Sequence, residues 1–264
     1  MRGRVLIVAG SDSGGGAGIQ ADIKTVTALG GYAATAVTAL TAQNTRGVLG
    51  IMRVEPGFVR RQIDAVLDDI GADCVKTGML VDAGIIGAVA DSLAHSAVPL
   101  VVDPVMLATS GAALLDPAAV EMLKSRLIAR ATVLTPNLPE AEALLGSRIA
   151  DGAAMDEAAA ALLKLGAKIV VLKGGHLPGK IVRDVIVGDG ETYSLEGERI
   201  ATRHTHGTGC TLASAIATGL AQGMAPRRAI ERAHAFVREA IRTAPGYGEG
   251  HGPLNHGHTV RGAP

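Results

Sequence analysis

Aromatic residues and cysteines are scarce in this sequence. Phe, Trp and Tyr make up 2% of the 264 residues, and Trp is absent. So few aromatic rings argue against a protein that stacks on the bases of single-stranded nucleic acid. The two cysteines, Cys74 and Cys210, are too few for a disulfide framework, and they fit a reducing compartment.

The sequence also lacks an excess of either charge and lacks long apolar runs. Lys and Arg together number 25, as do Asp and Glu, so no net charge attracts nucleic acid or an anionic membrane. No run approaches the roughly 18 apolar residues of a membrane span. The apolar start, residues 5–9, lacks the length and the cleavage site of a signal peptide. We therefore expect a cytoplasmic protein with no nucleic-acid or membrane partner.

What is present is an alternation of short β-branched runs with segments of helical periodicity. In residues 58–70, for example, Val59, Ile63 and Val66 follow a helical period. Near-continuous apolar strands that alternate with helices are typical of a mostly parallel sheet covered on both faces. No internal repeat, long linker or charge block divides the sequence, so we expect one α/β domain over residues 1–264.

These patterns predict the following elements. The predicted strands are 5–9, 33–40, 74–76, 100–103, 132–135, 169–172, 182–187 and 192–195. The predicted helices are 19–29, 58–70, 83–93, 118–127, 141–145, 157–165, 211–221 and 228–243. Residues 188–190, Gly-Asp-Gly, are typical of a hairpin between the last two strands. Residues 246–264, rich in Gly, Pro and His, are predicted to form a loop-like C-terminal tail with exposed histidines.

Ligands of such sheets bind beyond the carboxyl ends of the strands, and a glycine-rich loop lies at the first of these ends. Residues 10–18, GSDSGGGAG, follow the first predicted strand. Glycines let backbone N–H groups come close to an anion or a ring, whereas the alternative is a flexible connection. The spacing matches neither a dinucleotide-binding fingerprint nor a P-loop. Because so dense a glycine run costs chain entropy, we favour a functional loop.

A second glycine-rich segment, residues 204–210, precedes a predicted helix. Gly207, Thr208 and Gly209, with the unpaired N–H groups of the first turn, would form a cradle for a transferring phosphoryl group. Cys210 would lie at the positive end of the helix, where the pKa of a thiol tends to fall. The alternative is a glycine-rich N-cap followed by a small buried cysteine, and the sequence favours neither.

Three acidic or amide side chains are candidate metal ligands. Asn137 and Glu140 first of all match a capping box, with Pro139 near the helix start, and this interpretation is favoured. The competing interpretation places both on hydrated Mg²⁺, which takes a few oxygen ligands together with substrate phosphates. Asp103 ends a predicted strand and is either a further metal ligand or a turn residue before Pro104.

Two more polar residues follow predicted strands. Lys173 begins a Lys-Gly-Gly-His turn that suits a phosphate, although a solvated lysine would have the same sequence. Gln43 offers a paired donor and acceptor that match the amino group and nitrogen of a heterocycle. Its alternative role is hydrogen bonding within its own loop.

Taken in order, these segments resemble the hydroxymethylpyrimidine/phosphomethylpyrimidine kinases of thiamin biosynthesis, in the ribokinase-like superfamily. The resemblance spans nearly the whole chain and rests on AGSDSGGGAGIQADIKT, TALTAQNT, KTGML, DPVM, TPNLPEAEAL, LKGGH, HGTGCTLASAIA and GEGHGPLNH. It implies a ribokinase-like three-layer α/β/α fold with a central mostly parallel sheet, and a homodimer. It also implies that ATP, with Mg²⁺, phosphorylates 4-amino-5-hydroxymethyl-2-methylpyrimidine to its monophosphate and then to the diphosphate.

The resemblance further implies roles for individual residues. The residues expected around the pyrimidine are Ala17, Asp22, Gln43, Met79 and Val105, of which Gln43 would read the polar edge of the ring. Those expected around Mg²⁺ and the ATP phosphates are Asp103, Asn137, Glu140 and Lys173. Those expected at the phosphoryl-transfer site are Gly207, Thr208, Gly209 and Cys210.

Two other functions compete with this one. Most of the superfamily, including classical pyridoxal kinases, has aspartate at the position of Cys210, where the carboxylate acts as base for an alcohol acceptor. The cysteine therefore favours the pyrimidine kinase, although a cysteine-bearing vitamin B6 kinase would share the motif. A non-catalytic nucleotide or vitamin sensor is the third possibility, and the joint presence of Cys210, Lys173, Asn137 and Glu140 argues against it.

Overall fold

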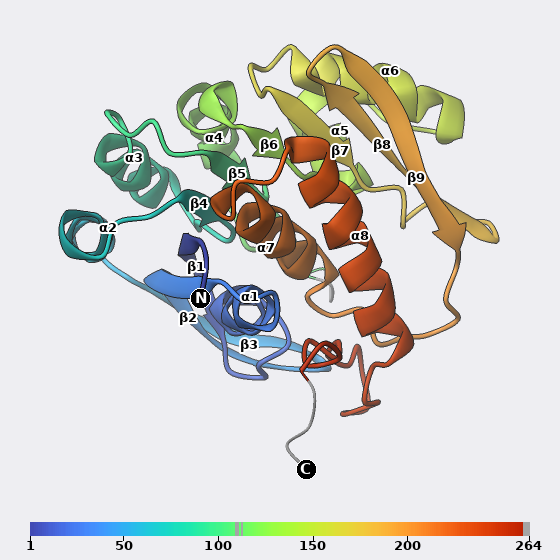
Figure 1. Cartoon of the computed structure of the whole chain (residues 1–264), viewed down its shortest axis with the longest axis horizontal. Helices are drawn as coiled ribbons and strands as arrows, with labels where there is room; N and C mark the ends of the chain where they lie inside the picture. Colours follow the sequence, from blue (N-terminus) through green and yellow to red (C-terminus); the bar gives the residue numbers. More distant parts are fainter. Residues whose placement is uncertain (109–110, 112, 261–264) are drawn as a thin grey trace.

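The computed structural model describes residues 1–108, 111 and 113–260, and it has three layers (Figure 1). Within these residues nine strands form one sheet in the order β3-β2-β1-β4-β5-β6-β7-β8-β9. The strands are β1 Arg4–Asp12, β2 Tyr32–Asn44, β3 Gly47–Arg53, β4 Cys74–Thr77, β5 Leu100–Val102, β6 Val133–Leu134, β7 Ile169–Leu172, β8 Ile181–Gly188 and β9 Glu191–Glu198. The ladder from β2 to β7 is parallel, whereas β3 and β8 pair antiparallel with their neighbours. The predicted α/β/α fold with a central mostly parallel sheet is confirmed.

Helices cover both faces of the sheet because successive residues of each strand point to opposite sides. Val5 and Ile7 of β1 face α1 Gly18–Ala28, α7 Thr208–Ala221 and α8 Pro226–Arg242. Leu6 and Val8 face the other layer of helices. That layer contains α2 Pro56–Asp69, α3 Ala83–Ser92, α4 Val120–Arg126, α5 Leu138–Leu145 and α6 Gly152–Leu163, together with the short 3-10 turns Pro117–Ala119 and Ile128–Arg130.

Each predicted strand and helix corresponds to an element of the structure, but β3 has no counterpart in the prediction. Gly47–Arg53 pairs with β2 at the edge of the sheet, so Leu49, Ile51 and Met52 stay exposed. A strand with exposed apolar side chains on both faces and two glycines has no clear alternation to detect. Helices α5 and α6 also begin earlier than predicted, because Asn137 and Asp151 cap them.

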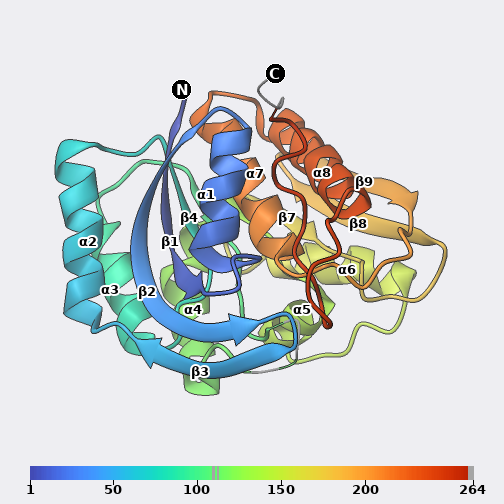
Figure 2. The same cartoon turned by 90° about the horizontal axis from the view of Figure 1, so that it is seen from below.

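The predicted loop-like tail is packed against the rest of the chain as far as residue 260 (Figure 2). The backbone N–H of His251 donates to the carbonyl of Thr45, and that of Asn255 donates to Ala240. His256 is 4% exposed and shares a hydrogen bond with Thr211 of α7, 2.9 Å away. The prediction that the histidines of this segment are exposed is therefore wrong for His256.

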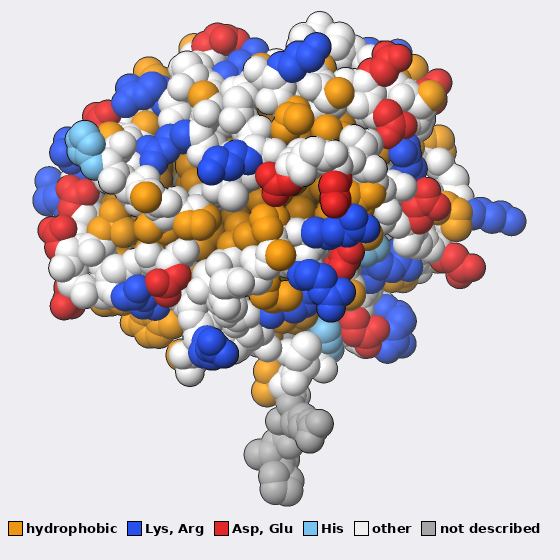
Figure 3. Space-filling view, turned by 45° about the horizontal axis from the view of Figure 1, so that its top comes forward, with side chains coloured by type: hydrophobic (Ala, Val, Ile, Leu, Met, Phe, Trp, Pro, Cys, Tyr) orange, Lys and Arg blue, Asp and Glu red, His pale blue; other side chains and the backbone are white. Residues whose placement is uncertain are grey.

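On the face shown in Figure 3, basic and acidic side chains are interspersed rather than gathered by sign. This distribution agrees with the equal numbers of acidic and basic residues in the sequence. Within the described ranges no helix combines the length and the apolar character that crossing a membrane requires.

Candidate active site

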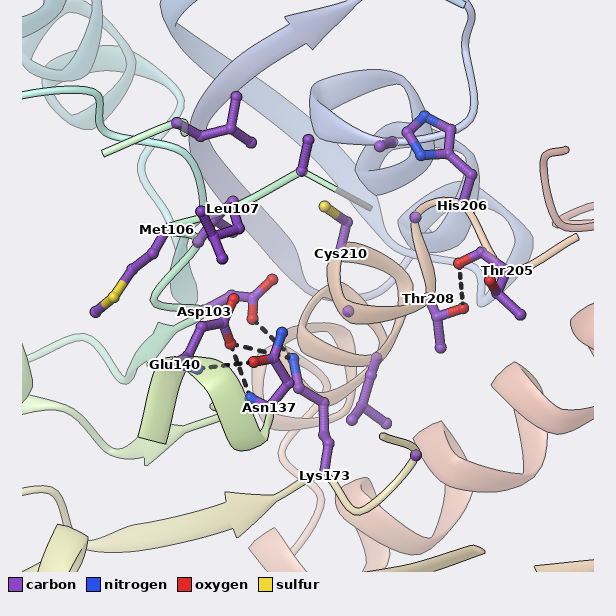
Figure 4. A pocket seen from close by; sticks show the side chains of 18 of the residues that line it. Asp103, Met106, Leu107, Asn137, Glu140, Lys173, Thr205, His206, Thr208 and Cys210 are labelled. Carbon is purple, nitrogen blue, oxygen red and sulfur yellow. Dashed lines mark hydrogen bonds and ion pairs between the residues drawn. The ribbon is translucent and has the colours of Figure 1, made fainter. Parts of the chain in front are cut away.

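A cavity of about 920 Å³ opens at the carboxyl ends of the parallel strands. Side chains that are far apart in the sequence meet here because strands β1, β4, β5, β6 and β7 all end at this edge. Every predicted site residue except Asp22 lines the cavity. Figure 4 shows Asp103, Asn137, Glu140 and Lys173 converging on one side of it, near the start of α7.

The start of α7 forms one wall of the cavity. Its N-cap, Gly207, has a φ of +82°, and a Cβ placed there would lie 1.9 Å from the carbonyl oxygen of Gly16. Only glycine permits both this backbone conformation and this close approach. A Cβ on Gly209 would lie 3.0 Å from Lys173 Nζ, so the first turn faces that ammonium closely. The unpaired N–H groups of this turn can therefore hold an anion beside Lys173.

The thiol of Cys210 stays protonated at neutral pH. Burial raises the pKa of Cys210 to about 12, and the nearby Lys76 ammonium only partly offsets the effect. The prediction of a lowered thiol pKa is therefore wrong. Loss of hydration disfavours the thiolate more than the helix terminus stabilises it. Cys210 contributes an uncharged, compact side chain to the cavity.

Lys173 is held between two carboxylates. Its Nζ lies 3.2 Å from Asp103 Oδ1 and 4.0 Å from Glu140 Oε2. Burial disfavours the charged ammonium, but the two carboxylates outweigh it and raise the pKa of Lys173. Thr135 donates to Asp103 Oδ1 at 3.1 Å, which fixes that carboxylate further. Lys173 is thus a positive charge held in a fixed position in the cavity.

Asn137 and Glu140 form the predicted capping box. The N–H of Glu140 donates to Asn137 Oδ1 at 2.9 Å, and the N–H of Asn137 donates to Glu140 Oε2 at 2.8 Å. Both residues also line the cavity, so capping does not remove them from the site. Burial raises the pKa of Glu140 to about 7, against the opposing charge of Lys173.

The donor set fits a hydrated Mg²⁺ rather than a metal enclosed by protein. Asp103 and Glu140 supply two carboxylates on one side of the cavity. No cluster of three or more His, Cys, Asp or Glu side chains suited to a metal occurs among the residues that the structure describes. Mg²⁺ commonly binds through one or two carboxylates and completes its shell with water and phosphates.

The glycine-rich loop is organised by the carboxylate of Asp12. Asp12 accepts hydrogen bonds from the N–H groups of Gly14, Gly16 and Ala17, at 2.7, 3.0 and 2.8 Å. These three donors therefore serve the loop itself rather than a bound anion. The role of Asp12 was missed, although an Asp just before a glycine run is typical of such a turn.

The pyrimidine-binding role implied for Asp22 does not agree with its position. Asp22 is fully buried and does not line the cavity; Lys76 Nζ contacts its Oδ2 at 2.9 Å and Ser214 donates to its Oδ1 at 2.7 Å. Burial disfavours the ammonium of Lys76, but the charge of Asp22 outweighs it and raises that pKa. Lys76 is not among the predicted site residues, although a lysine inside an apolar strand needs a buried partner.

The two ends of the cavity differ in chemistry. Gln43, Met79 and Val105 line the end near the glycine-rich loop, and Met79 is 8% exposed. The opposite end reaches α8 and the β8–β9 region. Residues lining that end, none of them assigned from the sequence, are Val182, Ile200, His234, Val237, Arg238 and Ile241.

Comparison with known proteins identifies the family. Residues 12–255 match the phosphomethylpyrimidine kinase family. The chain is 55% identical over 97% of its length to the thiamine biosynthesis bifunctional protein ThiED of Geobacter sulfurreducens, of which it spans 52%. It is 49% identical to the hydroxymethylpyrimidine/phosphomethylpyrimidine kinase of Streptomyces coelicolor, over 96% of this chain and 94% of that one.

A solved structure with the same fold is the pyridoxal kinase from Staphylococcus aureus in complex with ADP. It has a TM-score of 0.91 and 34% identity, and the match covers 99% of this chain and 96% of the other. The higher identity lies with the proteins named as pyrimidine kinases. The family match covers most of the sequence and includes nearly every residue of the cavity described above, so this chain belongs to the phosphomethylpyrimidine kinase family.

Proposed function

We propose that this protein uses ATP to phosphorylate 4-amino-5-hydroxymethyl-2-methylpyrimidine to its monophosphate and then to its diphosphate. The observation that carries the proposal is a single cavity in which the start of α7 and Lys173 adjoin the end lined by Gln43 and Met79. An acceptor ring and a phosphoryl donor therefore fit side by side. The names of the relatives supply the substrate class.

The walls of the cavity can stabilise the transferring group without changing shape. The N–H groups at the start of α7 and the ammonium of Lys173 are already oriented toward the same space. Such fixed donors stabilise the charge that develops on a phosphoryl group in the transition state. Asp103 and Glu140, with Asn137, would hold a hydrated Mg²⁺, whose charge offsets that of the phosphates. The neutral thiol of Cys210 leaves room for an anionic acceptor.

We propose that the nucleotide base binds at the α8 end of the cavity. Val182, Ile200 and Val237 supply apolar surface there, and His234 and Arg238 supply polar groups. An apolar slot with a few polar groups is typical of a site for a planar ring. The ADP named for the Staphylococcus aureus structure supports ATP as the donor.

The reaction is tested by mass spectrometry of the products. Purified protein is incubated with MgATP and the hydroxymethylpyrimidine, and the monophosphate and diphosphate are followed with time. We expect both to appear in that order. Absence of the diphosphate, together with rapid phosphorylation of pyridoxal, would assign the protein as a vitamin B6 kinase. Ligand binding without ATP consumption would assign it as a sensor.

The vitamin B6 kinase stays the second candidate because of one comparison. The pyridoxal kinase of Staphylococcus aureus shares the fold over 99% of this chain. Its identity of 34% is lower than the 49–55% of the pyrimidine-kinase relatives, which favours the pyrimidine as substrate. Competition between the two acceptors for one preparation of enzyme gives the ratio of kcat/KM values and decides the preference.

We also propose that the protein is cytoplasmic, because ATP is supplied there. We propose further that it is a homodimer, because the edge of the sheet formed by β2 and β3 exposes apolar side chains. Leu40 and Met52 lie opposite each other across the two strands and are 47% and 66% exposed, and Leu49 is 79% exposed. Paired apolar residues of this kind mark protein interfaces. Light scattering should give a dimer for the wild type and a monomer for Leu49→Asp/Met52→Lys. Ile181→Lys, on strand β8, is the matched control, and a monomeric wild type would contradict the proposal.

A further inference from the structure

Two glycine-rich loops meet on the acceptor side of the cavity. Asp12 ends β1 where the loop that carries Ala17 begins, and His206 directly precedes Gly207, the N-cap of α7. Nε2 of His206 lies 2.8 Å from Oδ2 of Asp12, although the two residues are 194 positions apart in the sequence. Figure 4 shows the His206 ring beside the wall that carries Cys210. This bond therefore joins the loop expected to hold the acceptor to the turn expected to hold the phosphoryl group.

The direction of the bond follows from charge. Burial opposes ionisation of Asp12, but the hydrogen bonds from His206, Gln43 and the Ala17 backbone outweigh it and lower the pKa of Asp12 to about 2. Asp12 is therefore an acceptor, and Nε2 of His206 carries the donated proton. The exposed fractions are 2% for Asp12 and 9% for His206, so water does not compete for the bond.

His206 is confined on its other sides as well. A Cβ on Gly16 would lie 2.5 Å from His206 Cδ2 and 3.2 Å from Pro253 Cβ. The backbone N–H of His206 donates to the carbonyl of Gly252 at 3.2 Å. The C-terminal segment therefore supports His206 from behind, and the imidazole lies between that segment and the glycine-rich loop.

Neither loop needs this bond for its own turn. The turn of the glycine-rich loop is closed by the N–H groups of Gly14, Gly16 and Ala17, which donate to Asp12. The first turn of α7 is closed by its own backbone bond from Thr211 to Gly207. The bond between Asp12 and His206 fixes the distance between the two loops. Holding reacting groups at a fixed distance can raise the reaction rate by a large factor.

We propose that His206 and Asp12 are positioning residues that set the distance between the acceptor and the transferring phosphoryl group. This inference rests on the proposed function, because it assigns the acceptor to the loop side and the phosphoryl group to the α7 side. The two residues act through the loops that they join. Losing the bond should therefore lower kcat more than it weakens ATP binding.

The test compares three substitutions at one position. His206→Leu removes the donor. His206→Gln keeps an N–H about as far from the backbone as Nε2, whereas the shorter side chain of His206→Asn keeps an N–H that does not reach Asp12. We expect kcat for the first transfer to fall on the order of 100-fold in the Leu and Asn variants. The Gln variant should recover to within about fivefold of the wild type, with the KM for ATP changed less than about twofold throughout. His258→Leu, which removes a bond to the Phe236 carbonyl in the same segment, is the control and should keep wild-type kcat.

The outcomes separate this inference from the proposed function. If the wild type does not phosphorylate the pyrimidine, the proposed function fails first. If the wild type is active and His206→Leu keeps its kcat, or loses only thermal stability, the positioning role is refuted. If the Leu variant does not fold, the Gln and Asn variants carry the test. Equal rates for those two would then overturn the inference.

Discussion

At the scale of single residues, the uncharged state of Cys210 decides which acceptors the site tolerates. A phosphomonoester acceptor is largely ionised at neutral pH, since its second pKa is near roughly 6. A fixed carboxylate beside it would repel it, because two unit charges about 4 Å apart interact by about 4 kcal/mol at an effective dielectric constant near 20. A thiol with a pKa of about 12 carries no charge and avoids this repulsion.

We therefore predict that Cys210→Asp slows the second transfer by at least about tenfold relative to the first, from the same Coulomb estimate. Cys210→Ala should leave the ratio of the two rates close to that of the wild type, because neither side chain is charged. Single-turnover rates, measured separately on the pyrimidine and on its monophosphate, give the ratio. Equal slowing of both steps by Cys210→Asp would contradict the charge argument.

Glu140 gives a second prediction, through the pH dependence of stability. Burial raises the pKa of Glu140 from its ordinary 4.5 to about 7, so the folded protein binds this proton more tightly than the unfolded chain. The stabilisation is present in full below pH 4.5 and is lost as pH rises through about 7. Metal binding should instead favour the ionised form of Glu140, because Mg²⁺ attracts the carboxylate.

Glu140→Gln keeps the cap and removes this proton equilibrium. Denaturant unfolding of the free protein at pH 5 and pH 7.5 should therefore show a smaller loss of stability in the variant than in the wild type. Glu142→Gln, on the same helix, is the control. His256 has a pKa lowered to about 4 by burial and contributes with the opposite sign, but it is present in all three proteins and cancels in the comparison. Identical pH profiles for the wild type and Glu140→Gln would contradict the prediction.

At the scale of elements, the sequence predicts the buried parts better than the edges. Strand β1 and helix α7 are recognisable in the sequence because nearly all of their apolar residues are buried. Strand β3 has no such pattern, since its partner covers only one edge. The site follows the same rule. Lys173 and Asp103 follow from the position of strand ends and Gly207 from the start of a helix, whereas the partners Asp12–His206 and Asp22–Lys76 depend on contacts between distant segments.

The start of α7 provides the prediction at this scale. Gly207→Ala introduces a Cβ at a φ of +82° and within 1.9 Å of the Gly16 carbonyl oxygen. Gly223→Ala is the matched control, because Gly223 has a φ of +80° and open space around it. The control should cost about 1–2 kcal/mol of stability from backbone strain alone. We expect a larger loss for Gly207→Ala, together with a loss of phosphoryl transfer that the control does not show, as measured by denaturant unfolding and turnover. Equal behaviour of the two variants would mean that the contact with Gly16 is unimportant.

At the scale of the whole molecule, the buried pair Asp22–Lys76 ties three elements together. Asp22 lies on α1, Lys76 lies on β4, and Ser214 of α7 donates to the same carboxylate. Both charged side chains are fully buried. Removing one partner leaves an uncompensated charge, whereas replacing both with apolar residues of similar size is often neutral.

We predict that Asp22→Leu alone lowers the free energy of unfolding by about 3–5 kcal/mol. The double variant Asp22→Leu/Lys76→Met should regain most of this loss. Urea denaturation of the two variants and the wild type measures both values. A double variant as unstable as the single one would mean that the pair stabilises the fold by more than charge compensation.

The support of His206 by Gly252 and Pro253 has a consequence for folding during synthesis. Asp12 leaves the ribosome before His206, which follows β9 in the sequence. A nascent chain that has emerged as far as residue 245 contains every strand and helix named above, yet it lacks the segment that confines His206. The sheet can therefore form around an open site while translation continues. We expect the two glycine-rich loops to reach their final separation only after Gly252 and Pro253 have left the exit tunnel.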